Sequence, residues 1–264
     1  MRIHIKSLIK YIFPRFFHDL YNYLRQVPKV IKYRHLLKVN NDWNGYYSGE
    51  DVFIIGNGPS LADIDFAFIK GKKVIVMNCF EKFTWKNELE IVAHCIGEPY
   101  DSISWSEDVF CNSIMGTNSR SYWFHFTSYK KIPINTDDKK LYYVFPILEP
   151  GLWGRKSVSL NKPTLGYQTT AQLAIQVAIF MGFKKIFLIG FDHDWLASPK
   201  FSRHFYSNEK DDIDKLGRWR YLDIINFMQR MWRIYYTLKN SAERSGTQVI
   251  NKTRGGFLDV FDTE

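Results

Sequence analysis

The densest group of chemically capable side chains is a short acidic stretch that follows an apolar run. Asp192, His193 and Asp194 occupy three consecutive positions directly after the apolar segment 185–190 and Phe191. Two carboxylates and an imidazole can hold a metal ion, bind a ribose, or orient one another for proton transfer. Such crowding at the expected end of a strand favours a functional role over packing, so Asp192 and Asp194 are candidate catalytic residues and His193 is a further site candidate.

A second histidine follows in a loop, flanked by two more polar groups. His204 lies between Arg203 and the pair Phe205 and Tyr206. The unperturbed pKa of histidine lies near neutrality, which suits an imidazole to accept a proton during catalysis. If the loop lies beside the acidic stretch, His204 is the candidate general base, and Arg203 and Tyr206 are further site candidates.

Two further segments carry residue types suited to a phosphate or a sugar. Residues 56–60 (GNGPS) follow the apolar run 51–55, and two glycines with a small serine let a backbone approach a ligand closely. Free N–H groups there would favour a phosphate, and a plain turn is the alternative. Residues 166–170 (GYQTT) open an expected helix, where Thr169 or Thr170 either meets a ligand or acts only as an N-cap.

Asn78 stands alone directly after the apolar run 72–77. At the carboxyl end of a strand, its amide can read a ribose or the edge of a base. The alternative is a local turn cap without a ligand.

The elements that must position these residues alternate along the chain. Apolar, β-branched runs predict strands, and 3.6-residue periodicity predicts helices. The expected helix 169–181 ends at Gly182, which is a C-cap glycine. This alternation predicts a Rossmann-like α/β fold with a mostly parallel sheet and flanking helices, whose ligands bind at the carboxyl ends of the strands. A short tail is expected from Gly255. The expected strands are 51–55, 72–77, 89–94, 141–146 and 185–190, and the expected helices are 169–181 and about 221–244.

The positive charge of the chain is concentrated at its N-terminus. Of the net charge of +9, residues 1–40 carry nine Lys or Arg and one Asp, which leaves the rest almost neutral. An apolar stripe from Ile5 to Leu24, divided at Pro14, predicts a basic amphipathic arm over 1–48, followed by a catalytic domain over 49–264. The arm either lies on an anionic membrane surface or packs on its own domain. The nearly neutral body argues against nucleic acid as a partner.

Composition excludes several other classes of protein. The 264 residues are 45% hydrophobic and 17% aromatic, which excludes a disordered chain. Three scattered cysteines without a CxxC pair predict neither a disulfide framework nor a structural zinc site, and they fit a reducing cytoplasm. No apolar stretch is long enough to span a bilayer.

Taken together, these motifs resemble a known superfamily. GNGPSL, the strand-end Asn78, the run 166–192 and the later His204 resemble the bacterial lipooligosaccharide sialyltransferases and the MptE-like (DUF115) proteins, over about residues 51–206. In the sialyltransferases the fold is Rossmann-like, the donor is CMP-sialic acid, and no metal is needed. The resemblance implies that His204 is catalytic and that Asp192 helps to hold the cytidine. The nucleotide-binding residues that it implies are Gly56, Asn57, Gly58, Ser60, Asn78, Gln168, Thr169, Gly190 and Phe191.

One departure from the sialyltransferase pattern concerns the leaving phosphate. Asp194 stands where those enzymes have a tyrosine, and an acid repels a phosphate unless a cation or an arginine intervenes. Arg203 and Tyr206 are the residues that would compensate. The departure leaves three donors open: CMP-sialic acid, another CMP-activated sugar acid, or a diphosphate donor with Mg²⁺.

The function expected from residues and resemblance is sugar transfer. A glycosyltransferase would move a sugar, sialic-acid-like if the donor is a CMP sugar, onto a surface polysaccharide or lipooligosaccharide acceptor. It would work without a cofactor, as a cytoplasmic protein peripheral to the inner membrane. The first alternative is a Mg²⁺-dependent pyrophosphokinase of the MptE-like type, with Asp192 and Asp194 as metal ligands. The second alternative is a nucleotide-binding protein without activity.

Overall fold

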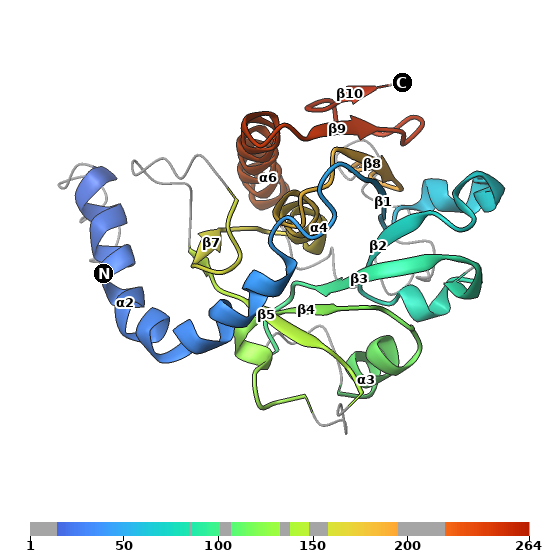
Figure 1. Ribbon diagram of the computed structural model, residues 1–264. Coiled ribbons are helices and arrows are strands. Elements are labelled where there is room, and N and C mark those ends of the chain that lie inside the picture. The colour runs from blue at the N-terminus through green and yellow to red at the C-terminus, as the bar shows by residue number, and fades with distance from the viewer. Residues whose placement is uncertain are drawn as a thin grey trace.

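The chain folds around an eight-stranded sheet in which every pair of neighbouring strands is parallel (Figure 1). The computed structural model describes residues 15–84, 86–100, 107–132, 138–147, 158–194 and 220–263. The strand order is β10-β9-β8-β1-β2-β3-β4-β5. The strands are β1 (Asp51–Ile55), β2 (Lys73–Met77), β3 (Glu90–Ile96), β4 (Tyr122–His125), β5 (Leu141–Val144), β8 (Lys185–Ile189), β9 (Gln248–Asn251) and β10 (Asp262–Thr263). The predicted α/β fold with a mostly parallel sheet is therefore confirmed.

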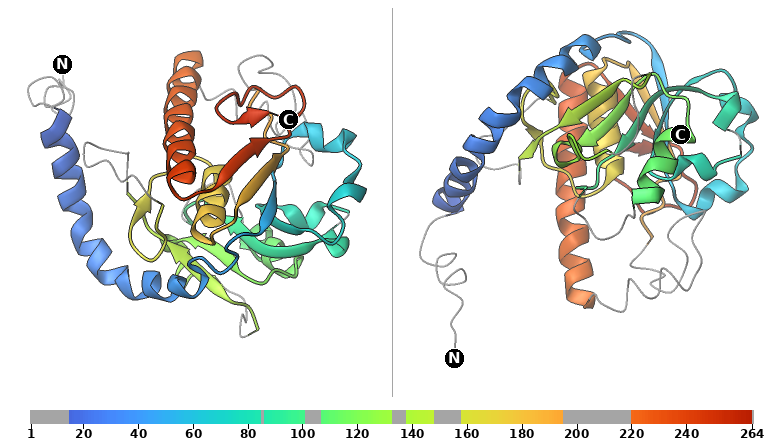
Figure 2. Two further views of the ribbon diagram at one scale, coloured as in Figure 1. Left: turned by 45° about the horizontal axis from the view of Figure 1, so that its top comes forward. Right: turned by 90° about the horizontal axis from the view of Figure 1, so that it is seen from below.

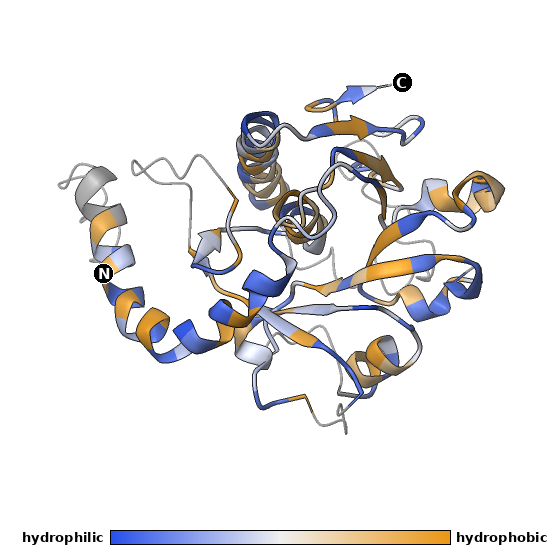
Figure 3. Cartoon of the chain, viewed as in Figure 1, coloured by the Kyte–Doolittle hydropathy of each residue, from blue (hydrophilic) through white to orange (hydrophobic). Residues whose placement is uncertain are grey.

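The central strands are apolar on both faces because both faces are covered. In β1, Val52 and Ile54 belong to the larger core, whereas Ile55 belongs to a second core on the other face. A buried parallel strand needs this continuous apolar run, which is why the sequence predicted β1, β2 and β8 to within one residue. Figure 3 shows the same apolar character along β2, β3 and β8.

Two long helices cover one face of the sheet (Figure 2). Helix α4 (Thr170–Phe180) packs on β1, β2 and β3, and α6 (Tyr221–Arg244) packs on α4 and β9. Buried Gln172 donates from Nε2 to the carbonyl of Met231 at 2.9 Å, which ties the two helices together. Gly182, with φ +85°, follows the last turn of α4, as the sequence predicted.

The opposite face is covered by short helices instead of long ones. The 3₁₀ helices η2 (Pro59–Asp63), η3 (Phe66–Ile69) and η4 (Phe80–Lys82) follow β1 and β2, and α3 (Glu107–Met115) lies between β3 and β4. Apolar side chains in and next to the three 3₁₀ helices form the second core with the strands, and Phe66 and Phe83 pack edge to face there at 4.6 Å between ring centroids. Helix α3 contributes Phe110 and Ile114 to a third core cluster.

The N-terminal helix α2 (Arg15–Val39) is longer than its predicted stripe, which ended at Leu24. Its last turns pack on the body: Leu36 and Leu37 are buried, and Asn40, just after the helix, donates from Nδ2 to the carbonyls of Tyr143 and Leu160 at 2.8 and 2.7 Å. The other end of α2 projects away from the sheet (Figures 1 and 2). The residues before 15, with Pro14, lie outside the described part of the chain.

Several elements were not expected from the sequence. β4 is a run of four bulky side chains without alternation, and β9 and β10 are short, so none of them stands out as a pattern. A separate two-stranded sheet pairs β6 (Pro146–Ile147) with β7 (Thr164–Leu165). The predicted tail after Gly255 is wrong, because Leu258, Val260 and Phe261 are buried and β10 pairs with β9.

Candidate functional site

The order in which the chain adds strands to the sheet reverses at β1. The site lies at this topological switch point. The chain runs from β1 to β2 on one side and later returns to β8 on the other side of β1. In open α/β sheets, ligands bind at the carboxyl ends of the strands next to such a switch point. Here the loops that follow β1 and β8 are 56–60 and 190–194, two of the segments that the sequence singled out.

The glycines of the first loop allow it to touch the second loop. A Cβ atom at Gly56 would lie 2.2 Å from the carbonyl oxygen of Gly190, and one at Gly58 would lie 1.6 Å from Oδ2 of Asp192. Both distances are far below van der Waals contact. The glycine pair is therefore needed by the fold itself, whether or not a ligand is bound.

Most backbone N–H groups of the glycine loop are already used within the protein. Gly56 and Gly58 donate to the carbonyls of Ile189 and Gly190 at 2.7 and 3.0 Å, and Ser60 donates to Oδ1 of Asp192 at 3.2 Å. The element that follows is a five-residue 3₁₀ helix instead of an α-helix. The expectation of free N–H groups at Gly56, Gly58 and Ser60 is therefore wrong, and these three groups are not available to a phosphate.

Asp192 is the charged group that joins the two loops. Its carboxylate also accepts a hydrogen bond from Oγ of Ser60 at 2.9 Å. Burial raises the pKa of Asp192 above its usual value, the two bonds from Ser60 oppose that rise, and the charge of Asp194 adds to it. A carboxylate held in this way can accept further hydrogen bonds from a ligand, as a ribose-binding group does.

The C-terminal segment supports Asp192 from behind, which the sequence did not suggest. The N–H of Phe257 donates to the carbonyl of Asp192 at 2.7 Å, and the N–H of Phe191 donates to Oγ1 of Thr253 at 2.9 Å. The residues after β9 therefore fix the loop after β8, although they are about 60 positions away in the sequence.

Asn78 is held in a left-handed conformation at the end of β2. Its φ is +52°, its N–H donates to the carbonyl of Cys95 at 3.0 Å, and its carbonyl lies 2.8 Å from Nε2 of His94. Burial lowers the pKa of His94 to about 4, so the neutral ring donates from Nε2 to that carbonyl. Oδ1 of Asn78 is buried without a hydrogen-bond partner among the described residues. A ligand that donates a hydrogen bond would satisfy it.

The N-terminus of α4 provides the free N–H groups that the glycine loop lacks. Thr169 is the N-cap, and its side chain accepts from the N–H of Gln172. Within the described residues, the N–H groups of Thr170 and Ala171 make no hydrogen bond. They lie at the positive end of the helix dipole, which favours an anion. Oε1 of Gln168, just before the cap, is buried without a partner among the same residues.

His193 is built into the wall beneath this helix end. Nε2 of His193 lies 2.7 Å from the hydroxyl of Tyr235 on α6, which also hydrogen-bonds to Thr169. Burial lowers the pKa of His193 to about 4, so the ring is neutral near pH 7. The position has φ +51°, which turns the ring inward. These contacts indicate a structural role for His193 instead of proton transfer.

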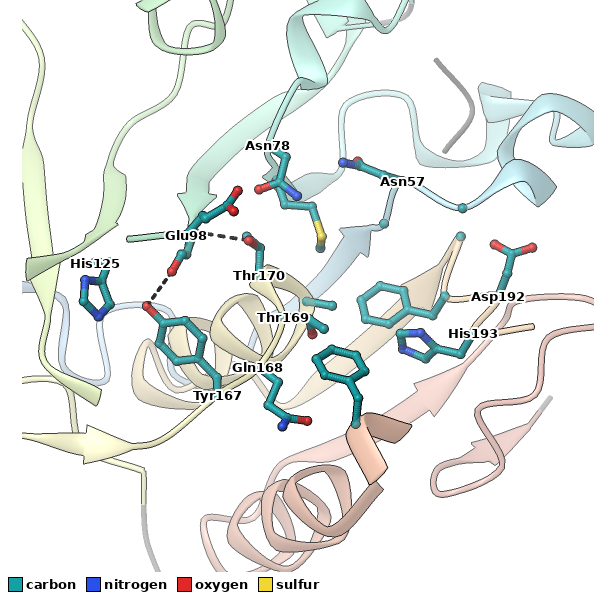
Figure 4. Close-up of a pocket in the computed structure, with 18 of the residues that line it drawn as sticks. Asn57, Asn78, Glu98, His125, Tyr167, Gln168, Thr169, Thr170, Asp192 and His193 are labelled. Atoms are coloured by element: carbon teal, nitrogen blue, oxygen red, sulfur yellow. Dashed lines mark hydrogen bonds between the residues drawn. The ribbon is translucent and has the colours of Figure 1, made fainter. Parts of the chain in front are cut away.

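These groups surround one cavity of about 580 Å³ (Figure 4). That volume lies in the range of small-molecule and cofactor sites. In Figure 4, Asp192 and His193 lie on one side, His125 and Glu98 on the other, and Thr169 and Thr170 between them. The predicted residues that line the cavity are Gly56, Asn57, Gly58, Asn78, Gln168, Thr169, Gly190, Phe191, Asp192 and His193.

Some predicted residues are not part of the cavity lining. Ser60 reaches the site only through Asp192, and Asp194 does not line the cavity. Arg203, His204 and Tyr206 lie outside the described residues. In the part of the chain that the structure describes, no three His, Cys, Asp or Glu side chains gather in a way that could hold a metal ion.

The sequence reasoning missed the other half of the cavity. Glu98, Pro99 and His125 line it at the ends of β3 and β4, beside Tyr167 of the predicted segment 166–170. Glu98 follows a predicted strand, so its position at a carboxyl end was a signal that could have been used. His125 ends β4, which was not predicted, so no pattern pointed to it.

The comparisons with known proteins find similar structures and no sequence relatives. No model of a known protein family matches the chain, and no curated protein matches it. Among solved structures, the chain is similar to the sialyltransferase CstII from Campylobacter jejuni in complex with CMP, with a TM-score of 0.47 and 14% identity, covering 82% of this chain and 85% of that chain.

Two further CstII structures give nearly the same similarity. The complex with a trisaccharide acceptor and CMP has a TM-score of 0.46 and 14% identity, covering 81% of this chain and 85% of that chain. The complex with CMP-3FNeuAc has a TM-score of 0.46 and 16% identity, covering 81% and 86%. These structures belong to the kind of enzyme that the sequence motifs resemble. The strand pairings and helix packing of the chain itself establish its fold.

Proposed function

We propose that the chain is a glycosyltransferase that moves a sugar from a nucleotide donor to a glycan or glycolipid acceptor. One observation carries the proposal: a single cavity at the switch point joins the open N-terminus of α4 to the buried amide oxygens of Asn78 and Gln168. The helix end suits a phosphate, and the amide oxygens suit the donor groups of a nucleoside. Gly58 and Asp192 line the same wall and would contact the ribose or the base.

The reaction that fits this arrangement is a direct displacement. An acceptor hydroxyl would attack the anomeric carbon, and the bond to the phosphate oxygen would break, with the electron pair leaving on the nucleotide. The N–H groups of Thr170 and Ala171 would stabilise the negative charge on the departing phosphate, a type of electrostatic stabilisation that is often the largest contribution to catalysis. The resemblance in sequence assigns the removal of the acceptor proton to His204.

The donor is proposed to be a CMP-activated sugar acid, used without a metal ion. Asp194 does not line the cavity, Asp192 already accepts two hydrogen bonds from Ser60, and no three possible metal ligands gather among the described residues. The helix N-terminus supplies positive potential for one phosphate without a cation.

This donor proposal predicts activity in the absence of divalent cations. Incubation with CMP-N-acetylneuraminic acid should release CMP at the same rate in EDTA as in Mg²⁺, measured by chromatography of the nucleotides. UDP-galactose serves as the control donor and should be turned over more slowly. Release of AMP from ATP only when Mg²⁺ is present would instead support the pyrophosphokinase and place Asp192 and Asp194 on the metal.

The exposed surface of α2 supports attachment to an anionic membrane, where a lipid-linked acceptor would be found. Side chains of α2 combine apolar groups and positive charge along its exposed length, the composition of an interfacial helix. None of the described helices is long and apolar enough to cross a bilayer. We place the enzyme in the cytoplasm, peripheral to the inner membrane. The exposed apolar residues include Tyr21, Leu24 and Ile31, and the exposed basic residues include Arg25, Lys29 and Lys32.

The membrane proposal predicts a loss of vesicle binding when the charge of α2 is removed. Changing Arg25, Lys29 and Lys32 to Gln should weaken sedimentation with phosphatidylserine vesicles about 100-fold, since each basic residue contributes about 1 kcal/mol at such a surface. The same change at the exposed residues Lys72, Lys140 and Lys184 is the matched control and should have little effect. An equal loss of vesicle binding in both variants would show that binding depends on the overall charge of the protein and not on α2.

A further inference from the structure

His125 lies at the end of β4, and one of its ring nitrogens, Nδ1, is already hydrogen-bonded within the protein. Nδ1 accepts a hydrogen bond from the N–H of Thr127 at 3.3 Å and lies 2.8 Å from Oγ1 of the same residue. That Oγ1 accepts from the N–H of Tyr100 at 3.0 Å, so its own hydrogen can point to Nδ1. Because Nδ1 accepts, the ring proton of a neutral His125 has to be on Nε2.

The other nitrogen, Nε2, makes no hydrogen bond with any described residue, although His125 is only 9% exposed. Nε2 is not one of the fully buried side-chain atoms that lack a hydrogen-bond partner, so it keeps some accessible surface. His125 is one of the residues that line the cavity (Figure 4), so the accessible Nε2 can meet a ligand there. The structure therefore presents a single, pre-oriented N–H donor at this end of the cavity.

We propose that His125 is a sugar-binding residue, whose Nε2–H donates a hydrogen bond to a hydroxyl or ring oxygen in the half of the cavity between the ends of β3 and β4. The identification of the ligand as a sugar rests on the proposed glycosyl transfer. The placement of a hydrogen-bonding subsite at this end rests only on the geometry of His125 and its neighbours.

The groups around His125 suit the hydroxyl groups of a sugar. Glu98 lines the same half of the cavity, and carboxylate oxygens are hydrogen-bond acceptors (Figure 4). A hydroxyl group can accept from His125 and donate to a carboxylate, so a polyhydroxylated ligand matches both. Pro99, Pro146 and the ring of Tyr167 add apolar surface of the kind that the C–H faces of a sugar can cover.

We expect His125 to bind the substrate by donating a hydrogen bond and not to act as a base. Burial lowers the pKa of His125 to about 4, so the ring is neutral near pH 7. With Nδ1 occupied by Thr127, the neutral ring has no lone pair directed into the cavity. The residue can therefore donate a hydrogen bond to the substrate and cannot take its proton.

Two conservative variants separate the binding role from the local structural role. His125→Gln keeps an amide N–H near the position of Nε2 and loses the acceptor for Thr127. His125→Asn keeps an acceptor near the position of Nδ1, where it can still cap η6 (Phe126–Ser128), and loses the donor to the cavity. A binding role requires Gln to be the better substitute, whereas a purely structural role requires Asn to be better.

The first measurement compares nucleotide sugars with free nucleotides by calorimetry, using CMP-N-acetylneuraminic acid against CMP and UDP-galactose against UDP. If the donor sugar contacts His125, His125→Asn should bind the nucleotide sugar about tenfold more weakly, the value of one neutral hydrogen bond. Binding of the free nucleotide should not change. His125→Gln should stay within about threefold of the wild type.

The second measurement tests the acceptor sugar with methyl β-galactoside and methyl N-acetyl-β-glucosaminide. In ¹⁵N-histidine-labelled protein, the ring signal that is absent from both variants belongs to His125. If this subsite holds the acceptor, a glycoside should shift that signal. The glycoside affinity should then fall in His125→Asn and persist in His125→Gln.

The outcomes for the two proposals differ. Glycoside binding without any nucleotide binding would contradict the glycosyltransferase and leave the subsite in place. Nucleotide binding with unchanged sugar affinities in His125→Asn would overturn the subsite and leave the proposed function in place. A fall in the thermal midpoint of His125→Gln alone, with normal sugar binding in both variants, would show that His125 only caps η6.

Discussion

Replacing His204 with alanine is expected to lower turnover by about 100-fold or more, without a change in nucleotide affinity. The acceptor hydroxyl needs a group that takes its proton near neutral pH. His204 is assigned to this role by the resemblance in sequence, and the described residues provide no better histidine. The pKa values of His125 and His193 are lowered to about 4, and both rings already have a structural partner.

The measurement for His204 is the rate of sugar transfer under saturating donor, with His35→Ala as the control. His35 is an exposed residue on α2 whose Nδ1 lies 3.1 Å from the carbonyl oxygen of Lys32 and whose ring packs edge to face on Tyr129. That variant should keep normal turnover. Normal turnover in His204→Ala would remove His204 from the mechanism. A loss confined to donor affinity would make it a binding residue instead.

Replacing Gly56 with alanine is expected to destabilise the fold by about 3 kcal/mol, because the new methyl group would overlap the backbone. The Cβ would lie 2.2 Å from the carbonyl oxygen and 2.8 Å from the carbonyl carbon of Gly190. A side-chain rotation cannot relieve a clash with backbone, so β1 and β8 have to separate at the site. The thermal midpoint should fall by roughly 6–12 °C for a domain of this size.

The control for Gly56 is Gly246→Ala. Gly246 has φ +73° and no atom within 4 Å of an added Cβ, so alanine there costs only the left-handed conformation, about 1 kcal/mol. Nucleotide affinity should fall in Gly56→Ala even below its midpoint, because the glycine loop and Asp192 move together, and should be unchanged in Gly246→Ala. Equal midpoints for the two variants would mean that the loops after β1 and β8 separate easily.

The parts of the fold that could be predicted are those with a strong local pattern. The apolar run 185–190 and the periodic helix 221–244 are recognisable without knowledge of their neighbours, and the structure places β8 and α6 there. β4 could not be predicted in the same way, because its side chains are buried by packing from both sides and its four residues show no alternation. The missing β4 also hid His125 and its half of the cavity.

The site was predicted in position more accurately than in mechanism. Residues such as Asn78 and Asp192 follow buried strands, and parallel strands bring their ends together at one edge, so their meeting could be inferred. The use of each N–H group depends on contacts between distant segments. The sequence could not show that Gly58 donates to Gly190, or that His94 holds the carbonyl of Asn78.

The proposed function requires the cavity to bind a nucleoside monophosphate without a metal ion. The most direct test is the thermal midpoint of the purified protein with CMP, CDP, UDP, GDP, ADP and ATP, each with and without Mg²⁺. At about 100 times its dissociation constant, a ligand adds roughly 2.7 kcal/mol, which raises the midpoint by at least about 5 °C. We expect such a shift with CMP, equal in EDTA and in Mg²⁺. A shift only with ATP or a nucleoside diphosphate plus Mg²⁺ would contradict it.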